Sequence, residues 1–255
     1  MPSSPTPDQP QILRTYTILH QLRPAWGGQF ILSLGLNPQG AALSIAANIA
    51  GAVSLAIDNN PTHIREVVRT GACDFIVTTL DEAIRAMKNE VRKHAPLSVA
   101  LNADPVTTLN EILERGLSPQ IFSTFLTPPD LAPELSTTLT LAAQRFQSQG
   151  AALINFSETP NPQPSPFAPG EALLAPLLTE RQWILNTFPF VTPADLRAFD
   201  AKALPLFSAE NPNDALRRRW LEAAPRILQR QRPPQRSLWL TESEFHKILS
   251  SQITS

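Results

Sequence analysis

The sequence predicts an α/β fold with a doubly wound, mostly parallel sheet. Short apolar runs alternate with helical segments in five successive units across 30–124, a pattern typical of parallel strands joined by right-handed crossovers. Three of the helices open with a polar residue followed by proline, which marks helix starts clearly. The first helix is rich in alanine and can lie close to a sheet. We therefore expect helices on both faces.

The first unit runs from a strand through a turn into a helix. The apolar run Phe30–Leu34 is of strand length and is followed by Gly35, a residue that permits a tight turn. Asn37 stands where an N-cap belongs, and Pro38 stands at the first helical position, where its missing N–H costs nothing. A second buried strand is predicted over Val53–Ile57.

This unit carries part of a dinucleotide-binding fingerprint. A Rossmann-like fold is typically marked by G-x-G-x-x-G and an acidic residue about 20 positions further on. The corresponding residues here are Gly35, Asn37, Gly40 and Asp58. Asn37 replaces the glycine that lets the backbone approach a pyrophosphate, and Pro38 removes one N–H from the helix N-terminus. The residues leave open both a nucleotide site and a scaffold that no longer holds a dinucleotide.

The later units follow the same pattern up to about residue 156. Predicted strands lie at 75–78, 97–101, 120–124 and 151–156, and predicted helices lie at 63–70, 80–95, 105–115 and 135–149. Thr79 and Glu82 form a capping box, Gly71 and Gly116 end helices, and Asp104 precedes a helix-opening proline.

We divide the chain into four parts. Residues 1–25 form a proline-rich tail and a lead-in helix, and residues 26–156 form the Rossmann-like domain. Residues 157–178 form a proline-rich linker, and residues 179–255 form a helical C-terminal appendage. Helices are predicted there at about 179–187, 193–199, 213–230 and from residue 241, without a second sheet.

The composition argues against several classes of partner and binding site. The 21 basic and 22 acidic residues nearly balance, which argues against nucleic acid or an anionic membrane as a partner. The single Cys73 excludes an internal disulfide and suggests a reducing compartment, and no apolar run has the length of a membrane span. We expect a cytoplasmic protein without a metal site, since the four histidines and the cysteine are scattered.

Five collinear segments carry a family resemblance. They are GAALSIAANIAGAVSLAIDNNPTHIREVVRTGACD, SVALNADPVTTLNEILERGLSP, GAALINFSETP, FPFVTPADLRAF and RWLEAAPRILQRQRPPQRSLWL. Together they resemble the urocanases, the urocanate hydratases of histidine catabolism, over about 26–248. The resemblance implies a urocanase-type Rossmann domain with part of the C-terminal region, in a short and divergent member of the family.

The resemblance also implies a cofactor and a reaction. Urocanases are carbon–oxygen lyases that use a tightly bound NAD⁺ as an electrophile toward the substrate imidazole, so that water can add. The implied cofactor-binding residues here are Gly35, Asn37, Gln39, Gly40, Asp58 and Asp104. Glu244 and His246 persist after the position of the family's reactive-site cysteine and are candidates for acid–base catalysis. Their spacing of two residues places them on different sides of a helix, which argues against joint action.

Several positions depart from the family pattern. Leu238 stands at the reactive-site cysteine, Asp104 replaces an asparagine, and 123–130 replaces a polar loop rich in cofactor and substrate contacts. The family's N-terminal portion has no counterpart. Two hypotheses follow: a catalytically degenerate paralogue that pairs with itself or with a urocanase-like partner, and an active NAD-dependent lyase, alone or in a complex.

Other residues admit a structural explanation. Asp58 is either a ribose ligand or an ordinary acid at a strand end, and Asn37 is either a ligand or a helix cap. We expect His63 on the surface and Cys73 in the core. The arginines near the C-terminus are expected to form a solvated basic face: Arg217, Arg218, Arg219, Arg226, Arg230, Arg232 and Arg236.

Overall fold

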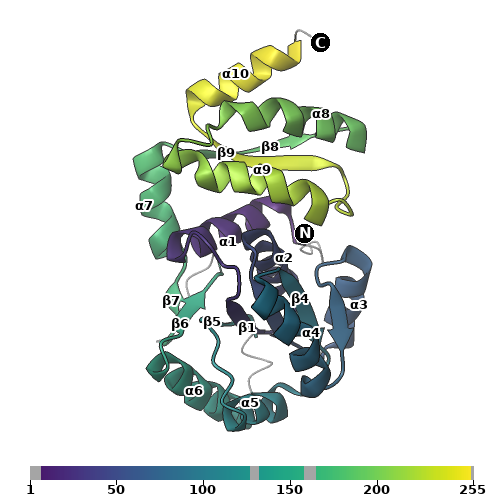
Figure 1. The fold of residues 1–255 in the computed structure, drawn as a ribbon, viewed down its shortest axis with the longest axis vertical. Helices are drawn as coiled ribbons and strands as arrows, with labels where there is room; N and C mark the ends of the chain where they lie inside the picture. Colours follow the sequence, from purple (N-terminus) through teal and green to yellow (C-terminus); the bar gives the residue numbers. More distant parts are fainter. Residues whose placement is uncertain (1–6, 127–131, 158–164, 254–255) are drawn as a thin grey trace.

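A seven-stranded sheet forms the centre of the molecule (Figure 1). The computed structural model describes residues 7–126, 132–157 and 165–253. The strand order is β3-β4-β2-β1-β5-β6-β7, and every neighbouring pair is parallel. The strands are β1 (Phe30–Leu34), β2 (Val53–Ile57), β3 (Phe75–Val77), β4 (Leu97–Leu101), β5 (Ile121–Thr124), β6 (Ala152–Asn155) and β7 (Ala168–Pro169). The predicted doubly wound α/β fold is confirmed.

Helices cover both faces of this sheet. One face packs against α1 (Gln9–Leu22), α2 (Pro38–Ala50) and α3 (Pro61–Thr70). The other face packs against α4 (Leu80–Lys93), α5 (Pro105–Glu114) and α6 (Pro133–Ser148). Strand side chains alternate between the two cores: Ile31 and Ala56 belong to the first, Leu32 and Leu55 to the second. Because both faces are covered, β1, β2 and β4 are apolar or small at almost every position.

The predicted helix caps are confirmed. Asn37 caps α2 and Asn60 caps α3, each followed by proline. Thr79 and Glu82 form the predicted capping box of α4, and Gly71 ends α3 in the left-handed conformation with a φ of 67°.

The C-terminal part differs from the prediction. It consists of α7 (Glu171–Arg181), β8 (Ile184–Pro189), α8 (Pro193–Ala203), two short 3₁₀ turns (Leu204–Leu206 and Pro212–Asp214), α9 (Ala215–Ile227), β9 (Gln235–Leu240) and α10 (Glu242–Ile253). The predicted helix over 179–187 is helical only to Arg181, where α7 ends, and α7 begins within the predicted linker 157–178. The predicted absence of a second sheet is wrong, because β8 and β9 form an antiparallel pair. Gln182 takes a positive φ of 53° and ends α7, and the chain then becomes extended.

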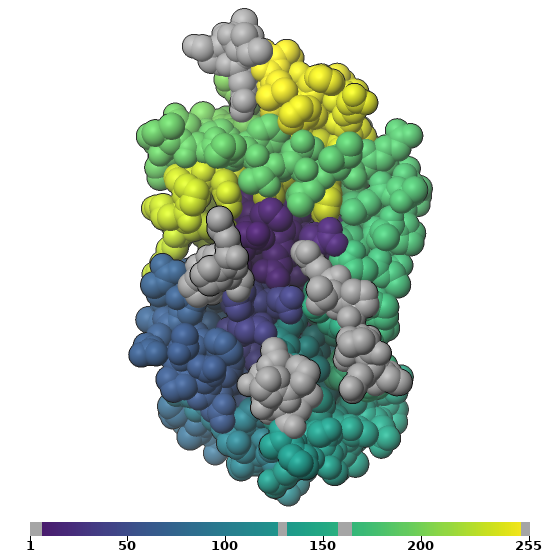
Figure 2. Space-filling model, turned by 180° about the vertical axis from the view of Figure 1, so that it is seen from behind, coloured from purple at the N-terminus to yellow at the C-terminus, as the bar shows by residue number. Residues whose placement is uncertain are grey.

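The lead-in helix α1 lies between the sheet domain and this C-terminal layer (Figures 1 and 2). The Gln9 side chain binds the β9 backbone twice: Nε2 donates to the Gln235 carbonyl at 2.6 Å, and Oε1 accepts from the Ser237 N–H at 2.9 Å. Trp239 Nε1 donates to the Thr17 hydroxyl at 2.8 Å. The side chains of α1 therefore join the two parts of the molecule through a shared core.

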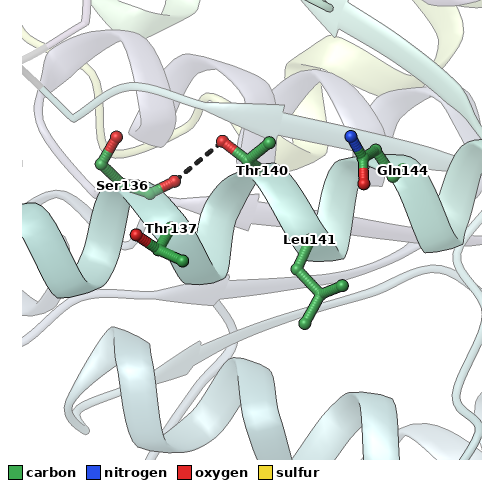
Figure 3. A pocket seen from close by; sticks show the side chains of 5 residues that line it. All are labelled: Ser136, Thr137, Thr140, Leu141 and Gln144. Atoms are coloured by element: carbon green, nitrogen blue, oxygen red, sulfur yellow. Dashed lines mark hydrogen bonds between the residues drawn. The ribbon is translucent and has the colours of Figure 1, made fainter.

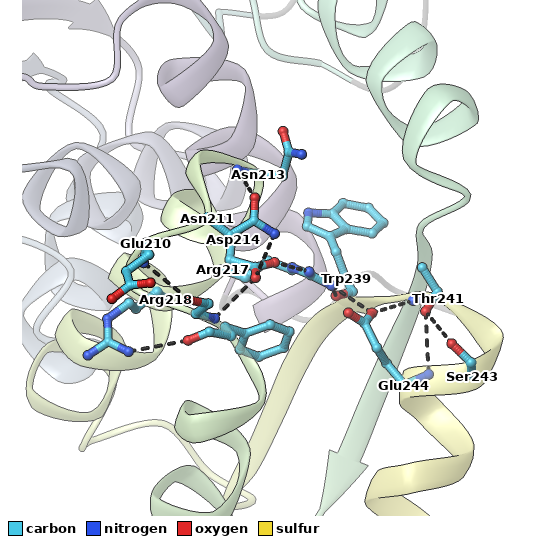
Figure 4. Close-up of polar contacts among 12 residues, drawn as sticks. Glu210, Asn211, Asn213, Asp214, Arg217, Arg218, Trp239, Thr241, Ser243 and Glu244 are labelled. Atoms are coloured by element: carbon cyan, nitrogen blue, oxygen red, sulfur yellow. Dashed lines mark hydrogen bonds and ion pairs between the residues drawn. The ribbon is translucent and has the colours of Figure 1, made fainter.

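Two of the C-terminal arginines are buried, which corrects the prediction of a wholly solvated face. Arg236 forms a bidentate ion pair with Asp200, with both N–O distances at 2.7 Å. Arg217 pairs with Asp214 and, at 2.7 Å, with Glu244 (Figure 4). It also lies against the Trp183 and Phe207 rings. Arg226, Arg230 and Arg232 are exposed, and Arg218 and Arg219 are half-buried.

A substitution at Asp200 tests the buried ion pair. Asp200→Asn leaves the Arg236 guanidinium buried without its counter-charge, so we expect the free energy of unfolding to fall by about 3–5 kcal/mol. The exposed Asp81–Arg115 pair provides the matched control, and Asp81→Asn should leave the urea midpoint nearly unchanged, because water screens the pair. Urea denaturation followed by circular dichroism measures both. Equal effects of the two substitutions would contradict the assignment.

Candidate functional site

The carboxyl ends of β1 and β5 form the topological switch point of the sheet. The chain passes from β4 on one side of β1 to β5 on the other, so the crossover direction reverses between these strands. Open α/β sheets bind their ligands in the crevice at such a point. The turn at Gly35 lies there, with a φ of 88° that glycine tolerates best.

Gly40 provides close contact between α2 and this turn. A Cβ built at Gly40 would overlap the Gly35 carbonyl oxygen and lie 2.9 Å from the carbonyl carbon. The residue therefore has the packing role of the third glycine of a dinucleotide-binding turn. The backbone of the turn has the Rossmann geometry that the sequence predicted.

Asn37 closes the N-terminus of α2 with its own side chain. Its Oδ1 accepts hydrogen bonds from the N–H groups of Gln39 and Gly40, both at 3.1 Å. Its Nδ2 donates to the Phe125 carbonyl at 2.8 Å. Pro38 has no N–H, and the Ala41 N–H donates to the Asn37 carbonyl at 2.9 Å. The donors that a phosphate would use at this helix end are bonded within the protein.

Asp58 is buried at the end of β2, and its carboxylate bridges three groups. Oδ2 accepts from the Leu36 N–H at 2.5 Å and lies 2.7 Å from His63 Nδ1. Oδ1 accepts from the Asn60 N–H at 2.7 Å. A ribose hydroxyl would have to compete with these partners. Through these contacts, Asp58 links the glycine turn to the start of α3.

His63 lies closer to the site than the sequence suggested. Its side chain is 31% exposed, and its Nδ1 lies 2.7 Å from Asp58 Oδ2, so the residue lies partly at the surface with a buried carboxylate as its partner. The sequence signal for this contact was the spacing of five residues between Asp58 at the strand end and His63 in the first turn of the next helix. The contact was not predicted because the direction of a side chain depends on tertiary packing.

Phe125 and Leu126 cover the glycine turn. A Cβ at Gly40 would lie 3.2 Å from Phe125 Cδ2, and a Cβ at Gly35 would lie 3.5 Å from Leu126 Cδ2. Phe125 is buried at the switch point. Apolar side chains thus occupy space beside the turn that a dinucleotide would approach. The rest of the divergent 123–130 run, from residue 127 on, lies outside the described residues.

The other two predicted cofactor residues, Gln39 in the first turn of α2 and Asp104 after β4, have partners within the protein. Gln39 Nε2 donates to the Ser157 hydroxyl at 3.3 Å. Asp104 follows β4 and caps α5, accepting from the Thr107 N–H at 2.9 Å. The structure thus groups Gly35, Asn37, Gly40 and Asp58 tightly, and it gives Asp104 a capping role at the same edge of the sheet.

Glu244 and His246 lie on α10, at the opposite end of the molecule from the β1 turn (Figure 1). Glu244 accepts from the Thr241 N–H at 2.8 Å as part of a capping box and also pairs with Arg217 (Figure 4). His246 is exposed, and its ring contacts Phe245. This arrangement gives Glu244 a structural role and separates both residues from the predicted cofactor turn.

A surface hollow lies elsewhere, on the outer side of α6 (Figure 3). Its lining comes from that one helix: Ser136, Thr137, Thr140, Leu141 and Gln144. It contains none of the predicted site residues. Within the described ranges, no group of three or more His, Cys, Asp and Glu side chains is arranged to hold a metal ion, and no helix is long and apolar enough to cross a membrane.

One comparison with known proteins matches part of the chain. Residues 15–127 match the family model described as the urocanase Rossmann-like domain. This match confirms the urocanase resemblance over the strands and helices that build the switch point. That domain family is associated with NAD binding. The residues of this turn do not fit the cofactor's diphosphate well, because Asn37 already satisfies the donors of α2.

A glycine substitution tests the close contact of the turn. Alanine normally stabilises a helix by about 1 kcal/mol relative to glycine, but Gly40→Ala should destabilise the protein by at least about 2 kcal/mol because its methyl group overlaps Gly35. Gly116→Ala is the control: its φ is 67° but nothing lies within 4 Å of the added atom, so about 1 kcal/mol is expected. Urea midpoints compare the two. A stabilising Gly40→Ala would refute the close packing.

The reactivity of Cys73 tests its burial. Cys73 is half-buried against the core that contains α2. Desolvation of the thiol raises the pKa of Cys73 to about 12, so on the order of 10⁻⁴ of the molecules carry a thiolate at pH 8. We expect very slow reaction with a thiol-specific disulfide reagent in the native protein. Unfolding in urea should restore the rate of an ordinary cysteine. Rapid modification of the folded protein would assign Cys73 to an accessible, reactive environment instead.

Proposed function

We propose that this urocanase-like protein has a binding or regulatory role. Its Rossmann-like domain would bind NAD weakly or not at all, and its lyase activity would be lost. The observation that carries the proposal is the Asn37 cap, which occupies the Gln39 and Gly40 N–H groups. A diphosphate would have to displace this side chain before it could bind them. The displaced Asn37 would also lose its bond to the Phe125 carbonyl.

The energy of this competition supports weak binding. Each internal hydrogen bond contributes about 0.5–1.5 kcal/mol, and leaving a buried partner unsatisfied costs about 1–3 kcal/mol. Diphosphate binding would break two hydrogen bonds to the Asn37 side-chain oxygen and one from its side-chain nitrogen. Several kcal/mol correspond to a loss of two or more orders of magnitude in affinity.

The proposed loss of lyase activity has separate support. Leu238, which stands where the resemblance places the reactive-site cysteine, is a buried apolar residue of β9. Glu244 is held by Arg217 and by the Thr241 N–H. Neither residue presents a free reactive group near the Gly35 turn.

The alternative function is an active NAD-dependent lyase of the urocanate hydratase type, alone or in a complex. It is favoured by the Rossmann-like shape of the turn: Gly35 has a positive φ and Gly40 permits close approach of α2. In that case the Asn37 side chain would rotate away on binding, and Asp58 would exchange a protein partner for a ribose hydroxyl.

Calorimetric titration with NAD⁺ tests the proposal. We expect no saturable binding below the millimolar range for the unaltered chain. Asn37→Gly removes the side chain that competes for the two N–H groups, so it should raise NAD⁺ affinity by about 100-fold, the equivalent of about 2.8 kcal/mol. Asn60→Gly is the matched control, since Asn60 caps α3 through the Thr62 N–H at 2.9 Å. It should leave NAD⁺ affinity unchanged.

The alternative makes the opposite prediction. A dinucleotide that copurifies with the protein, seen in its ultraviolet spectrum, or a micromolar dissociation constant for the unaltered chain would establish a working cofactor site. Urocanate hydration by the purified protein, followed by loss of urocanate absorbance, would then decide in favour of the lyase.

A further inference from the structure

Arg219 of α9 joins the C-terminal layer to the ends of α1 and α2. Its guanidinium donates to the carbonyl of Ala50, the last residue of α2, and, at 3.3 Å, to the carbonyl of Pro24, which follows α1. A Cβ at Gly51 would lie 2.7 Å from Arg219 Nη2, so the contact is close. α2 has no basic residue in its last turn. Arg219 therefore supplies the positive charge that complements the carboxyl end of this helix.

His20 lies in the last turn of α1, on the side that faces α9. Its ring is tilted by 57° relative to the Tyr16 ring, and the two ring centroids are 6.2 Å apart. Tyr16 in turn lies 5.7 Å from the Trp220 ring of α9 and donates its hydroxyl proton to the Leu216 carbonyl at 3.2 Å. These contacts place the imidazole of His20 at the interface between α1 and α9.

The Nδ1 atom of His20 is shielded from solvent and has no hydrogen-bond partner among the described residues. A neutral imidazole tolerates this position, because its proton can reside on Nε2 and leave Nδ1 as a lone pair. An imidazolium carries an N–H at both nitrogens. Protonation of His20 would therefore place a buried N–H without an acceptor at the interface, which costs free energy.

The charges around His20 also oppose its protonation. α9 contributes Arg219 and Glu222, and the chain after α1 contributes Arg23, which is exposed. Glu222 is paired with Arg218 at 3.0 Å. Burial, and then the Arg219 guanidinium, lower the pKa of His20 from its ordinary value. A cation at His20 would therefore repel the guanidinium that joins the two layers.

We propose that His20 is an acid-sensitive contact at the interface between α1 and α9. When its imidazole gains a proton, repulsion and the unpaired N–H weaken the bonds that Arg219 makes with Ala50 and Pro24. The C-terminal layer then loosens from the sheet domain, and loss of the proton restores the interface. His20 takes no part in the contacts of the Gly35 turn, so this proposal and the one on NAD binding can fail independently.

The lowered pKa sets the direction of the pH dependence. In the unfolded chain, the imidazole gains its proton near the ordinary pKa of about 6.5. In the folded protein the pKa of His20 is lower, so the unfolded chain binds more protons just below this pH. The stability that neutral His20 contributes is therefore fully present above about pH 6.5 and is lost as the pH falls.

Urea denaturation at pH 7.5 and pH 5.5 tests the contact. Other groups also titrate in this range, so the unaltered chain is compared with His20→Gln, which stays uncharged. Acidification should raise the unfolding equilibrium constant of the unaltered chain about three- to tenfold more than that of the variant. Tenfold is the limit for a histidine that is protonated only in the unfolded chain. His246→Gln is the matched control, since His246 is exposed on α10. It should behave as the unaltered chain, and equal acid losses in all three proteins would overturn the proposal.

Hydrogen exchange locates the effect of acid. After correction for the intrinsic pH dependence of exchange, the unaltered chain at pH 5.5 should gain exchange in α9 and in the carboxyl half of α2, with β4 and β5 unchanged. The gain should be absent from His20→Gln. A uniform gain along the chain, or an equal gain in His20→Gln, would assign the acid effect to other groups.

Proton NMR titration of the unaltered chain tests the same contact if His20→Gln does not fold. The chain has four histidines, and single variants of His63, His94 and His246 identify the His20 resonance by elimination. Its titration midpoint should lie below about 6.5. Arg219→Gln removes the neighbouring positive charge and should raise the midpoint. A midpoint at or above the ordinary value in the unaltered chain would refute the proposal.

Discussion

The close approach of α2 to the Gly35 turn determines the carboxyl edge of this sheet. Gly40 lies against the Gly35 carbonyl with no room for a side chain. A row of small residues in register across the strands, Ala100, Ala56, Ser33 and Ser123, lets α2 and its neighbours approach the sheet. With the helix fixed so near, its first N–H groups point into a narrow space beside β5. The groups that occupy this space, either side chains or a ligand, determine whether the carboxyl edge of the sheet is a binding site or a part of the core.

The features predicted from sequence were those set by local chemistry. The caps at Asn37, Asn60 and Thr79 involve residues two or three positions apart, so the pattern of polar residue, proline and following N–H is visible in the chain itself. The alternation of strands and helices is likewise local and was confirmed. At the candidate site, the glycines and Asp58 were identifiable because the fingerprint has a fixed spacing.

The features that were missed depend on distant partners. Arg236 and Asp200 are 36 positions apart, and nothing local distinguishes a buried arginine from a solvated one. Phe125 reaches the turn across the switch point, and its contact with Gly40 spans two strands. β8 follows a helix directly, and only the left-handed Gln182 marks the change. In each case tertiary packing decided between two conformations that the local sequence allows.

The polar groups of the turn have partners within the protein. A helix N-terminus with free N–H groups needs water or an anion. Here Asn37 supplies an acceptor for the helix, and Asp58 supplies one for the Leu36 N–H. Phe125 then covers the turn with apolar surface. Three separate contacts close the edge, so reversing any one of them leaves the other two in place. An intact Rossmann-like geometry is therefore compatible with the weak cofactor binding proposed above, since opening the Asn37 contact alone would restore only part of the affinity of a dinucleotide site.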